Sequence, residues 1–245
     1  MSQFSSPFQR VRPLLGTLVA VDAQGGTAPE TAGVSAFAAI KRVEELMRPL
    51  TAGSDLQRLS AALAGTELRI DPWTYAVLEM ARRFHAESGG VFDPCLPTRP
   101  GRLGDLELRA PDRVVVHTPV ALDLGGIAKG FAEDRAVDEL KRHGCTRGLV
   151  NAGGDLRCFG AEPHTIELRR HDESSRQALR LMLTDCALAV SAPRSPSSPS
   201  EHAGYYVGST GEPIRGAWTA VIAPEAAVAD ALTKCVMLTE PHVAA

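Results

Sequence analysis

Ten residues, Leu122 to Phe131, constrain the fold more than any other part of this 245-residue chain. Residues 114–116 and 121–124 are apolar and partly β-branched, a pattern typical of extended chain. Gly125-Gly126 then removes two side chains at the point where the chain turns. Residues 127–143 place apolar side chains on one stripe, which predicts an amphipathic helix. The sequence therefore predicts a strand, a glycine turn and a helix in direct succession.

Such a turn presents free backbone N–H groups at the positive end of a helix dipole, which suits a phosphate or another anion. Lys129 lies in the first helical turn, where the dipole disfavours a cation unless an anion is near. Asp123 ends the predicted strand and could accept a hydrogen bond or serve a metal. The alternative is a purely structural turn, because most strand–glycine–helix turns in α/β proteins bind nothing.

The composition excludes several classes of protein. With 44% hydrophobic residues the chain can bury a sizeable core, yet no apolar run approaches the roughly 20 residues of a membrane helix. The net charge is -3, with no basic block and only 5% aromatic residues, so nothing points to nucleic acid. Residues 1–12 lack the apolar core of a signal peptide, and we expect a cytoplasmic protein. The sequence does not indicate an oligomeric state.

Local signals divide the chain into helices and strands. Ser54 with Gln57 forms a capping box, and Asp71-Pro72 is an N-cap followed by proline at the first helical position. Prolines among the serines of residues 191–200 indicate a loop. The pattern predicts helices over residues 31–47, 55–63, 72–88, 127–143 and 225–238, and strands over residues 14–22, 113–117, 120–124, 148–151, 164–169, 181–191 and 217–223.

No internal repeat or long linker divides these elements. We therefore expect a single α/β domain over residues 1–245, of the α+β class, with a mixed, mainly antiparallel sheet and flanking helices. The early helices could form a lobe against the sheet.

Several short motifs together resemble the ApbE family of flavin transferases, also called FAD:protein FMN transferases. Residues 123–130 are very similar to the family signature D-L-G-G-I-A-K-G, and residues 151–155 match N-A-G-G-D. The pieces come in the family's order and span most of the chain. Further matches are Leu15-Gly16-Thr17 to M-G-T, Ser54-Asp55-Leu56 to S-E-L, residues 90–94 to G-A-F-D-P, and residues 229–232 to A-D-A-L.

The resemblance implies an ApbE-like fold, similar to the T-fold, and a specific reaction. Members of the family cleave the pyrophosphate of FAD with Mg²⁺, release AMP and attach FMN to an acceptor flavoprotein. The new bond is a phosphoester to a Ser or Thr hydroxyl of that acceptor. A hard cation prefers oxygen ligands and offsets charge on the leaving phosphate, so Mg²⁺ suits this chemistry.

The resemblance also implies roles for individual residues. Gly126 would offer a backbone carbonyl to the metal, Asp230 a carboxylate, and Thr233, on the same helix face, a further oxygen. Asp230 and Lys129 would act in catalysis, and Asp155 would hold its glycine turn. The residues expected at the flavin or its phosphates are Leu15, Leu50, Val91, Phe92, Asp93, Asp123 and Lys129.

Four features depart from the family pattern, and one is Leu50, which stands where the family often has a tyrosine that can face the flavin. A threonine usually stands four residues after the metal-binding aspartate, and this chain has Lys234 there. An ammonium cannot ligate Mg²⁺, but it could pair with Asp230 or contact a phosphate. The family's H-I-x-D-P-x-T-G is reduced to residues 205–211, which lack the His and the Asp-Pro. Its S-T-S-G is replaced by Ser191-Ala192-Pro193-Arg194.

These matches and departures leave three functions open. The first is a Mg²⁺-dependent FMN transferase with a modified site. The second is a flavin-nucleotide-binding protein that lacks transfer activity and acts as a carrier, a sensor or a partner of another protein. The third is an FAD pyrophosphatase with water as acceptor. An oxygen cluster at residues 230–234 would support metal chemistry, whereas an Asp230–Lys234 pair would argue against it.

Overall fold

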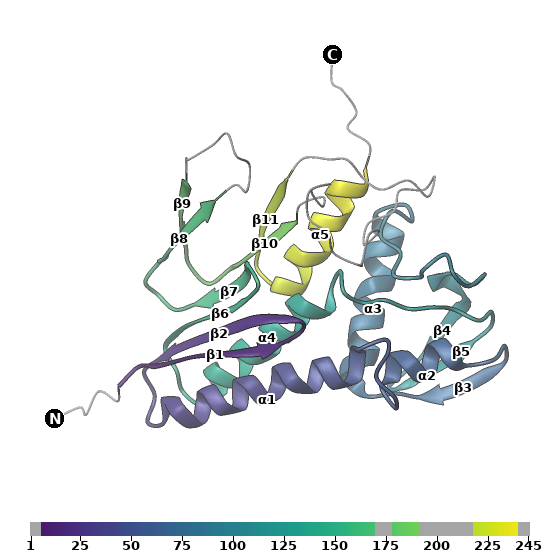
Figure 1. Cartoon of the computed structure of the whole chain (residues 1–245), viewed down its shortest axis with the longest axis horizontal. Coiled ribbons are helices and arrows are strands. Elements are labelled where there is room, and N and C mark those ends of the chain that lie inside the picture. Colours follow the sequence, from purple (N-terminus) through teal and green to yellow (C-terminus); the bar gives the residue numbers. More distant parts are fainter. Residues whose placement is uncertain (1–5, 170–177, 192–217, 240–245) are drawn as a thin grey trace, which may run out of the picture.

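The computed structural model describes residues 6–169, 178–191 and 218–239 (Figure 1). The loop predicted within residues 191–200, apart from Ser191, and the reduced motif at 205–211 therefore lie outside the described residues. The helices are α1 (Pro29–Met47), α2 (Asp55–Ala61), α3 (Pro72–Glu87), η1 (Leu103–Asp105), α4 (Ala128–Arg142) and α5 (Ala226–Leu238). The strands are β1 (Phe8–Leu14), β2 (Thr17–Gln24), β3 (Thr66–Arg69), β4 (Leu106–Arg109), β5 (Arg113–Val116), β6 (Arg147–Ala152), β7 (Asp155–Phe159), β8 (His164–Arg169), β9 (Ala178–Leu183), β10 (Ala187–Ser191) and β11 (Thr219–Ala223).

The early helices begin where their capping residues predict. Ser54 Oγ accepts a hydrogen bond from the backbone N–H of Gln57 at 3.1 Å, at the start of α2. Asp71 Oδ1 accepts one from the N–H of Trp73 at 2.9 Å, at the start of α3. Buried Asp55 joins the two helices, because its Oδ2 accepts the backbone N–H of Asp71 at 2.8 Å. Local capping chemistry therefore sets the position of both helices.

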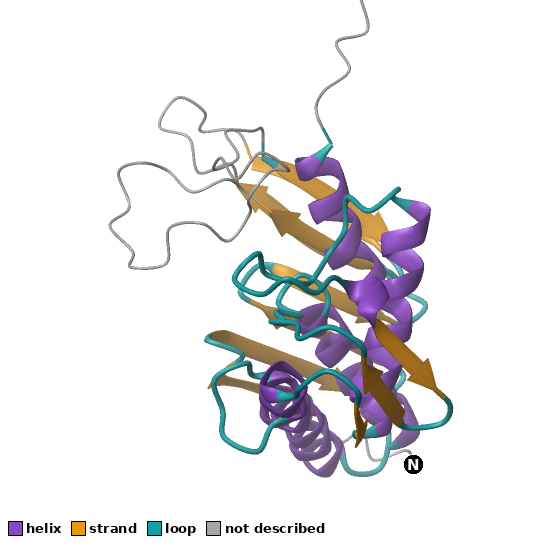
Figure 2. Ribbon diagram, turned by 90° about the vertical axis from the view of Figure 1, so that its right-hand side faces the viewer, coloured by secondary structure: helices purple, strands orange, loops and turns teal. Residues whose placement is uncertain are grey.

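The largest sheet has 6 strands in the order β1-β2-β6-β7-β10-β11. All pairings between named strands are antiparallel, which confirms the predicted α+β class with flanking helices. Helices α1, α4 and α5 contact this sheet and lie together on one of its faces (Figure 2). Adjacent residues Leu149 and Val150 on β6 pack into two different apolar clusters, since neighbouring strand residues point to opposite faces. The β8–β9 hairpin covers the second face through Leu181 and Leu183.

The N-terminal region differs from the prediction. A single strand over residues 14–22 was expected, but the structure forms a hairpin of β1 and β2. The chain turns at Leu15 and Gly16, which have φ angles of 55° and 71°. β1 gives almost no apolar signal because it is an edge strand in which only Phe8 is buried. The same turn lines a cavity through Leu15 and Gly16.

Two other predicted strands are also wrong. Residues 120–124 form only an isolated bridge between Leu122 and Cys95, because their short partner segment follows Pro94. Residues 181–191 are divided into β9 and β10, and Asp185 between them has a φ of 45°.

A second sheet, β3-β5-β4, packs with α3 into the same apolar core as β2 and β6. One continuous core therefore underlies both sheets.

Candidate functional site

The glycine turn before α4 is built largely from its own polar groups. Asp123 Oδ1 accepts the backbone N–H of Gly125 at 2.8 Å, which folds the carboxylate back over the turn. Ile127, the N-cap of α4, makes no side-chain capping bond. The first-turn N–H groups of α4 therefore take other partners, and one of these comes from α5.

Helices α4 and α5 cap each other. Asp134 on α4 accepts the backbone N–H groups of Ala226 and Ala227, at 2.8 and 2.9 Å, at the start of α5. In return, Asp230 Oδ2 on α5 accepts the N–H of Gly130 in the first turn of α4, at 3.3 Å. A Cβ at Gly130 would collide with the backbone carbonyl of Ala226, so only glycine permits this approach. The two helix starts thus hold each other in register.

Lys129 forms an ion pair with Asp155 beside the start of α4. Asp155 is buried, and its Oδ1 also accepts the N–H of Val190 on β10 at 2.7 Å, whereas we expected it to hold its own glycine turn. Burial opposes the charge on Lys129, but the carboxylates of Asp230 and Asp155 outweigh burial and raise the pKa of Lys129 above its ordinary value. The ammonium is therefore fully charged at neutral pH.

Glu133 lies one helical turn beyond Lys129 and is fully buried. Its Oε1 accepts the backbone N–H of Ala152 at 3.1 Å, and its Oε2 has no hydrogen-bond partner. Burial raises the pKa of this carboxyl well above its usual range, and the negative charge of Asp155 adds to the shift. Glu133 therefore anchors the end of β6 through a carboxyl group whose negative charge is disfavoured by burial.

A second lysine, Lys234, lies in an enclosed cluster of oxygen atoms. Its Nζ is 2.5 Å from Asp230 Oδ1 and 3.0 Å from both Ser191 Oγ and Thr233 Oγ1. Ser191 Oγ and Thr233 Oγ1 are themselves 2.9 Å apart. The side chain of Lys234 also runs past Gly126, where a Cβ would lie 3.3 Å from Lys234 Cγ. The sequence suggests an ion pair between Asp230 and Lys234, four residues apart, and the structure contains it.

The expected Mg²⁺ ligands are close together, but their arrangement does not suit Mg²⁺. The stem of Lys234 occupies the space that a Cβ of Gly126 would approach, while Asp230 Oδ1 and the Thr233 hydroxyl both contact its ammonium. Mg²⁺ requires near-octahedral oxygen ligands at roughly 2.0–2.1 Å, and a cation already lies among these oxygens. Within the described parts of the chain, no group of three or more His, Cys, Asp or Glu residues could hold a metal ion.

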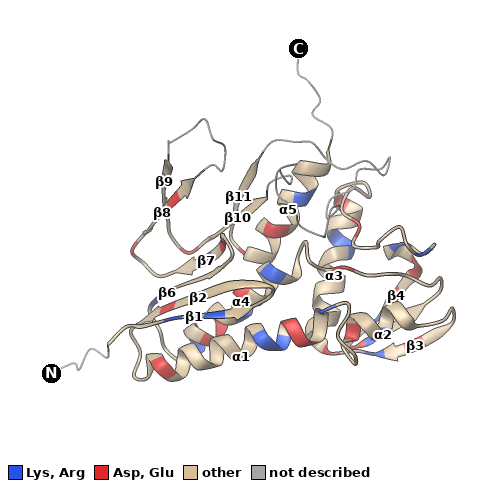
Figure 3. Ribbon diagram, in the orientation of Figure 1, with Lys and Arg blue, Asp and Glu red and all other residues tan. Residues whose placement is uncertain are grey.

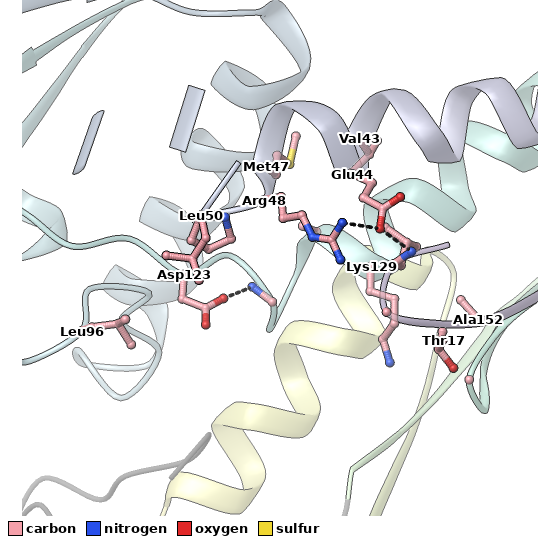
Figure 4. Close-up of a pocket in the computed structure, with 16 residues that line it drawn as sticks. Thr17, Val43, Glu44, Met47, Arg48, Leu50, Leu96, Asp123, Lys129 and Ala152 are labelled. Carbon is pink, nitrogen blue, oxygen red and sulfur yellow. Dashed lines mark hydrogen bonds and ion pairs between the residues drawn. The ribbon is translucent and has the colours of Figure 1, made fainter. Parts of the chain in front are cut away.

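A cavity of about 720 Å³ opens next to the α4 turn (Figure 4). Leu96 and Asp123 line one end of it in this view, and Thr17 and Ala152 line the other. Three turns that contain motif residues converge on the cavity, together with the end of α1. The lining residues are Leu15, Gly16, Thr17, Val43, Glu44, Met47, Arg48, Pro49, Leu50, Leu96, Asp123, Gly125, Ala128, Lys129, Ala152 and Gly153.

The structure places four of the predicted flavin-site residues in this lining and three outside it. Those in the lining are Leu15, Leu50, Asp123 and Lys129. Phe92 is instead buried against Phe84, with ring centroids 5.9 Å apart. Asp93 Oδ1 accepts the N–H of Cys95 at 2.9 Å, as a turn residue does, and Val91 precedes them outside the lining.

Sequence reasoning missed the contribution of α1 to the cavity. Glu44 Oε1 accepts the backbone N–H of Leu15 at 3.0 Å and lies 3.5 Å from Arg48 Nη1. A Glu and an Arg four residues apart are typical of an exposed helix face, and therefore gave no functional signal. Val43 and Met47 are buried in the core, and both also border the cavity.

Charged side chains of both signs are mixed over the part of the chain that the structure describes. Lys and Arg are interspersed with Asp and Glu over the helices and strands in the view of Figure 3. None of the described helices has the length and apolar composition needed to cross a membrane.

Comparison with known proteins agrees with the motif resemblance. The family model described as the ApbE family matches residues 15–103 and 102–245. The FAD:protein FMN transferase of Treponema pallidum is 26% identical over 199 residues, which cover 63% of this chain and 55% of that protein. The FAD:protein FMN transferase of Rhodobacter capsulatus is 27% identical over 190 residues, 64% of this chain and 36% of that protein. This chain thus spans about half of the first relative and about a third of the second.

Solved structures share the fold across nearly the whole chain. The ApbE protein from Thermotoga maritima has a TM-score of 0.81 at 24% identity, covering 95% of this chain and 87% of that one. The apo flavinyl transferase ApbE from Pseudomonas stutzeri has a TM-score of 0.83 at 21% identity, covering 99% and 87%. With the family model matched from Leu15 to the C-terminus, this chain belongs to the ApbE family.

Proposed function

We propose that this protein transfers FMN from FAD to an acceptor flavoprotein. A Ser or Thr hydroxyl oxygen of the acceptor attacks the phosphorus atom on the FMN side of the pyrophosphate. The bond from that phosphorus to the bridging oxygen breaks, AMP leaves with the electron pair, and the hydroxyl proton is released. The products are AMP and a protein that carries FMN through a phosphoester bond.

The observation that carries this proposal is the cavity at the meeting point of the family motifs. Its volume, about 720 Å³, lies within the range of roughly 300–1,000 Å³ typical of ligand pockets. Leu15, Gly16, Asp123 and Lys129 all line it, although they come from segments more than 100 residues apart. Relatives of this chain in two bacteria are FAD:protein FMN transferases, and a flavin dinucleotide is a ligand of suitable size and polarity.

The cavity offers both apolar and cationic walls, as a flavin nucleotide requires. Leu50 and Leu96 are 96% and 42% exposed and can cover the face of a planar ring. The Lys129 ammonium, kept charged by Asp155, suits the pyrophosphate, and Arg48 provides a second cation that is half exposed. No step is assigned to a metal ion, because two of the expected Mg²⁺ ligands, Asp230 and Thr233, already contact the ammonium of Lys234.

One observation favours a second function, the binding of FAD without transfer. The Asp230–Lys234 pair is buried, and each carboxylate oxygen of Asp230 already accepts a hydrogen bond, so this pair must break before Asp230 can act on a substrate. A protein of this kind would keep the cavity and lose the reaction. It would serve as a flavin-nucleotide carrier, sensor or partner of another protein.

Incubation of the purified protein with FAD and a flavoprotein acceptor domain separates these functions. AMP is followed by chromatography, and FMN bound to the acceptor by flavin fluorescence in a denaturing gel. The proposal predicts AMP in equal amount to covalent FMN, and a large loss of both in Lys129→Met. The matched control is Lys41→Met, which removes an exposed lysine from the surface of α1.

The other outcomes of the same experiment contradict transfer. AMP released without acceptor would identify an FAD pyrophosphatase. FAD bound with no AMP under any condition would establish the binding protein. FAD not bound at all would exclude both.

A further inference from the structure

We infer that the ammonium of Lys234 is a built-in cation of this site and makes flavin-nucleotide binding independent of divalent metal ions. The ammonium replaces a bound ion as the positive partner of Asp230. The part of this inference that concerns flavin binding rests on the function proposed above. The part that concerns metal ions stands on the side chains alone.

The cluster has the composition of a cation site, and a lysine fills it. An ammonium carries three N–H donors, and the structure places three oxygen atoms within 3.0 Å of Nζ. The exposed fractions of Asp230 and Thr233 are both 0%, and that of Ser191 is 5%. A second cation placed among these oxygens would meet the charge of Lys234 in a region that water does not screen.

The position of Nζ is set by rigid elements on two sides. Asp230 and Lys234 are one helical turn apart on α5, so their side chains share a face. Gly126 allows the stem of Lys234 to pass, because a Cβ there would approach Lys234 Cγ to 3.3 Å. The hydroxyl of Thr233 is held by the backbone carbonyl of Asp230 at 2.7 Å, and this bond orients it toward the cluster.

The cluster connects directly to the start of α4 and so to the cavity. Asp230 Oδ1 accepts from Lys234, while its Oδ2 accepts the N–H of Gly130. Gly130 follows Lys129, which lines the cavity. A covalently attached ammonium is always present, whereas a metal ion is present only according to its concentration. Binding in the cavity should therefore not respond to chelators.

The first test uses the unmodified protein and FAD. The dissociation constant is measured by flavin fluorescence in excess EDTA and in millimolar Mg²⁺. We expect the two values to agree within about twofold, a difference below 0.5 kcal/mol. Binding that is weaker by about tenfold or more in EDTA would overturn the inference.

The second test uses Mn²⁺ alone and does not depend on flavin. Free Mn²⁺ is counted by its electron paramagnetic resonance signal during titration with protein. We expect no binding to the unmodified protein and one equivalent bound to Lys234→Thr, in which a hydroxyl replaces the ammonium. Lys41→Thr, which removes an exposed lysine also paired with an acidic residue four positions away, should behave as the unmodified protein.

These two tests separate the inference from the proposed function. If the protein binds no FAD, the proposed function fails, and the Mn²⁺ titration alone still decides whether Lys234 excludes metal. Stoichiometric Mn²⁺ binding by the unmodified protein would overturn the inference. The unmodified protein supplies this result even where Lys234→Thr does not fold. For a folded Lys234→Thr, FAD affinity should fall about tenfold or more in EDTA and recover with Mg²⁺, and an unchanged affinity in EDTA would contradict the inference.

Discussion

Lys129 and Lys234 are two lysines of similar chemistry in different surroundings. Each is paired with a buried aspartate, Asp155 for Lys129 and Asp230 for Lys234. The side chain of Lys129 is 28% exposed and borders the cavity, whereas that of Lys234 is 7% exposed and lies among three oxygen atoms. The same ion-pair chemistry therefore leaves one lysine accessible to a ligand and encloses the other.

The difference teaches that accessibility, and not the presence of a carboxylate partner, decides what each lysine can do. Lys129 can approach a phosphate from the cavity while its partner keeps it charged. Lys234 would have to break several buried hydrogen bonds before it could move. We therefore assign ligand binding to Lys129 and charge balance to Lys234. The following predictions test this division, from the largest expected effect to the smallest.

Loss of the enclosed ammonium should have the largest effect on stability. In Lys234→Met, Asp230 becomes an unpaired buried carboxylate, which should lower the free energy of unfolding by about 3–5 kcal/mol. Urea unfolding followed by circular dichroism measures this change. The double variant Asp230→Asn/Lys234→Met, which removes both charges, should recover most of the loss. If Lys234→Met were as stable as Lys41→Met, the ammonium of Lys234 would not be needed to balance the buried charge of Asp230.

Asp134, which accepts the N–H groups at the start of α5, should make the stability of the protein depend on pH. Burial raises the pKa of Asp134 to about 6, although the N–H groups of Ala227 and Ala226 lower it. The native pKa exceeds the unfolded value, so protonation of Asp134 stabilises the folded protein. This contribution to the free energy of unfolding, about 3 kcal/mol in total, is fully present at low pH and is lost as pH rises through about 6.

Asp134→Asn cannot titrate and provides the measurement. The free energy of unfolding of the variant minus that of the unmodified protein should be larger at about pH 7 than at about pH 4, by up to about 3 kcal/mol. Urea unfolding of both proteins at the two pH values gives the difference. A stability difference that is the same at both pH values would show that Asp134 keeps an ordinary pKa.

Loss of the accessible ammonium should affect ligand binding most. In Lys129→Met, one charge-assisted contact to the pyrophosphate is lost, worth about 1.5–3 kcal/mol, so the dissociation constant for FAD should rise about 10- to 100-fold. Flavin fluorescence titration measures it, with Lys41→Met as the control. Equal FAD affinity in both variants would remove Lys129 from the binding site.

The smallest effect is expected at the edge of the enclosed cluster. Ser191→Ala removes one of the oxygen atoms around Lys234 and leaves Asp230 and Thr233 in place. The free energy of unfolding should fall by about 1 kcal/mol, and FAD affinity should stay unchanged. Urea unfolding and flavin titration of the same preparation test both points. A loss of FAD affinity without a loss of stability would show that the cluster is open to the ligand.

Much of the fold followed from local signals. Capping at Ser54 and Asp71 set the starts of α2 and α3, and the apolar stripe from residue 127 predicted α4 to within one residue at each end. β1 was missed because an edge strand with one buried side chain has no apolar alternation. β3 and β4 are only 4 residues long, too short for a periodic pattern to be recognised.

The candidate site was predictable to a lesser extent. Motif similarity found Leu15, Asp123 and Lys129, because each stands in a motif that can be recognised by its glycines. It did not find Glu44 or Arg48, whose ordinary helical spacing hides their contact with the cavity. Phe92 was expected at the flavin but belongs to the core, because an aromatic side chain gives the same signal in either place.

The sequence by itself determined the family, the class of fold and the departure at Lys234, because these depend on residue identity and on interactions between near neighbours. Only the tertiary structure decided what that departure does. Ser191 and Lys234 are 43 residues apart, and no local pattern places their side chains together. Packing of β10 against α5 brings the hydroxyl to the ammonium and buries both. Burial then converts a surface-type helical pair into an enclosed cation.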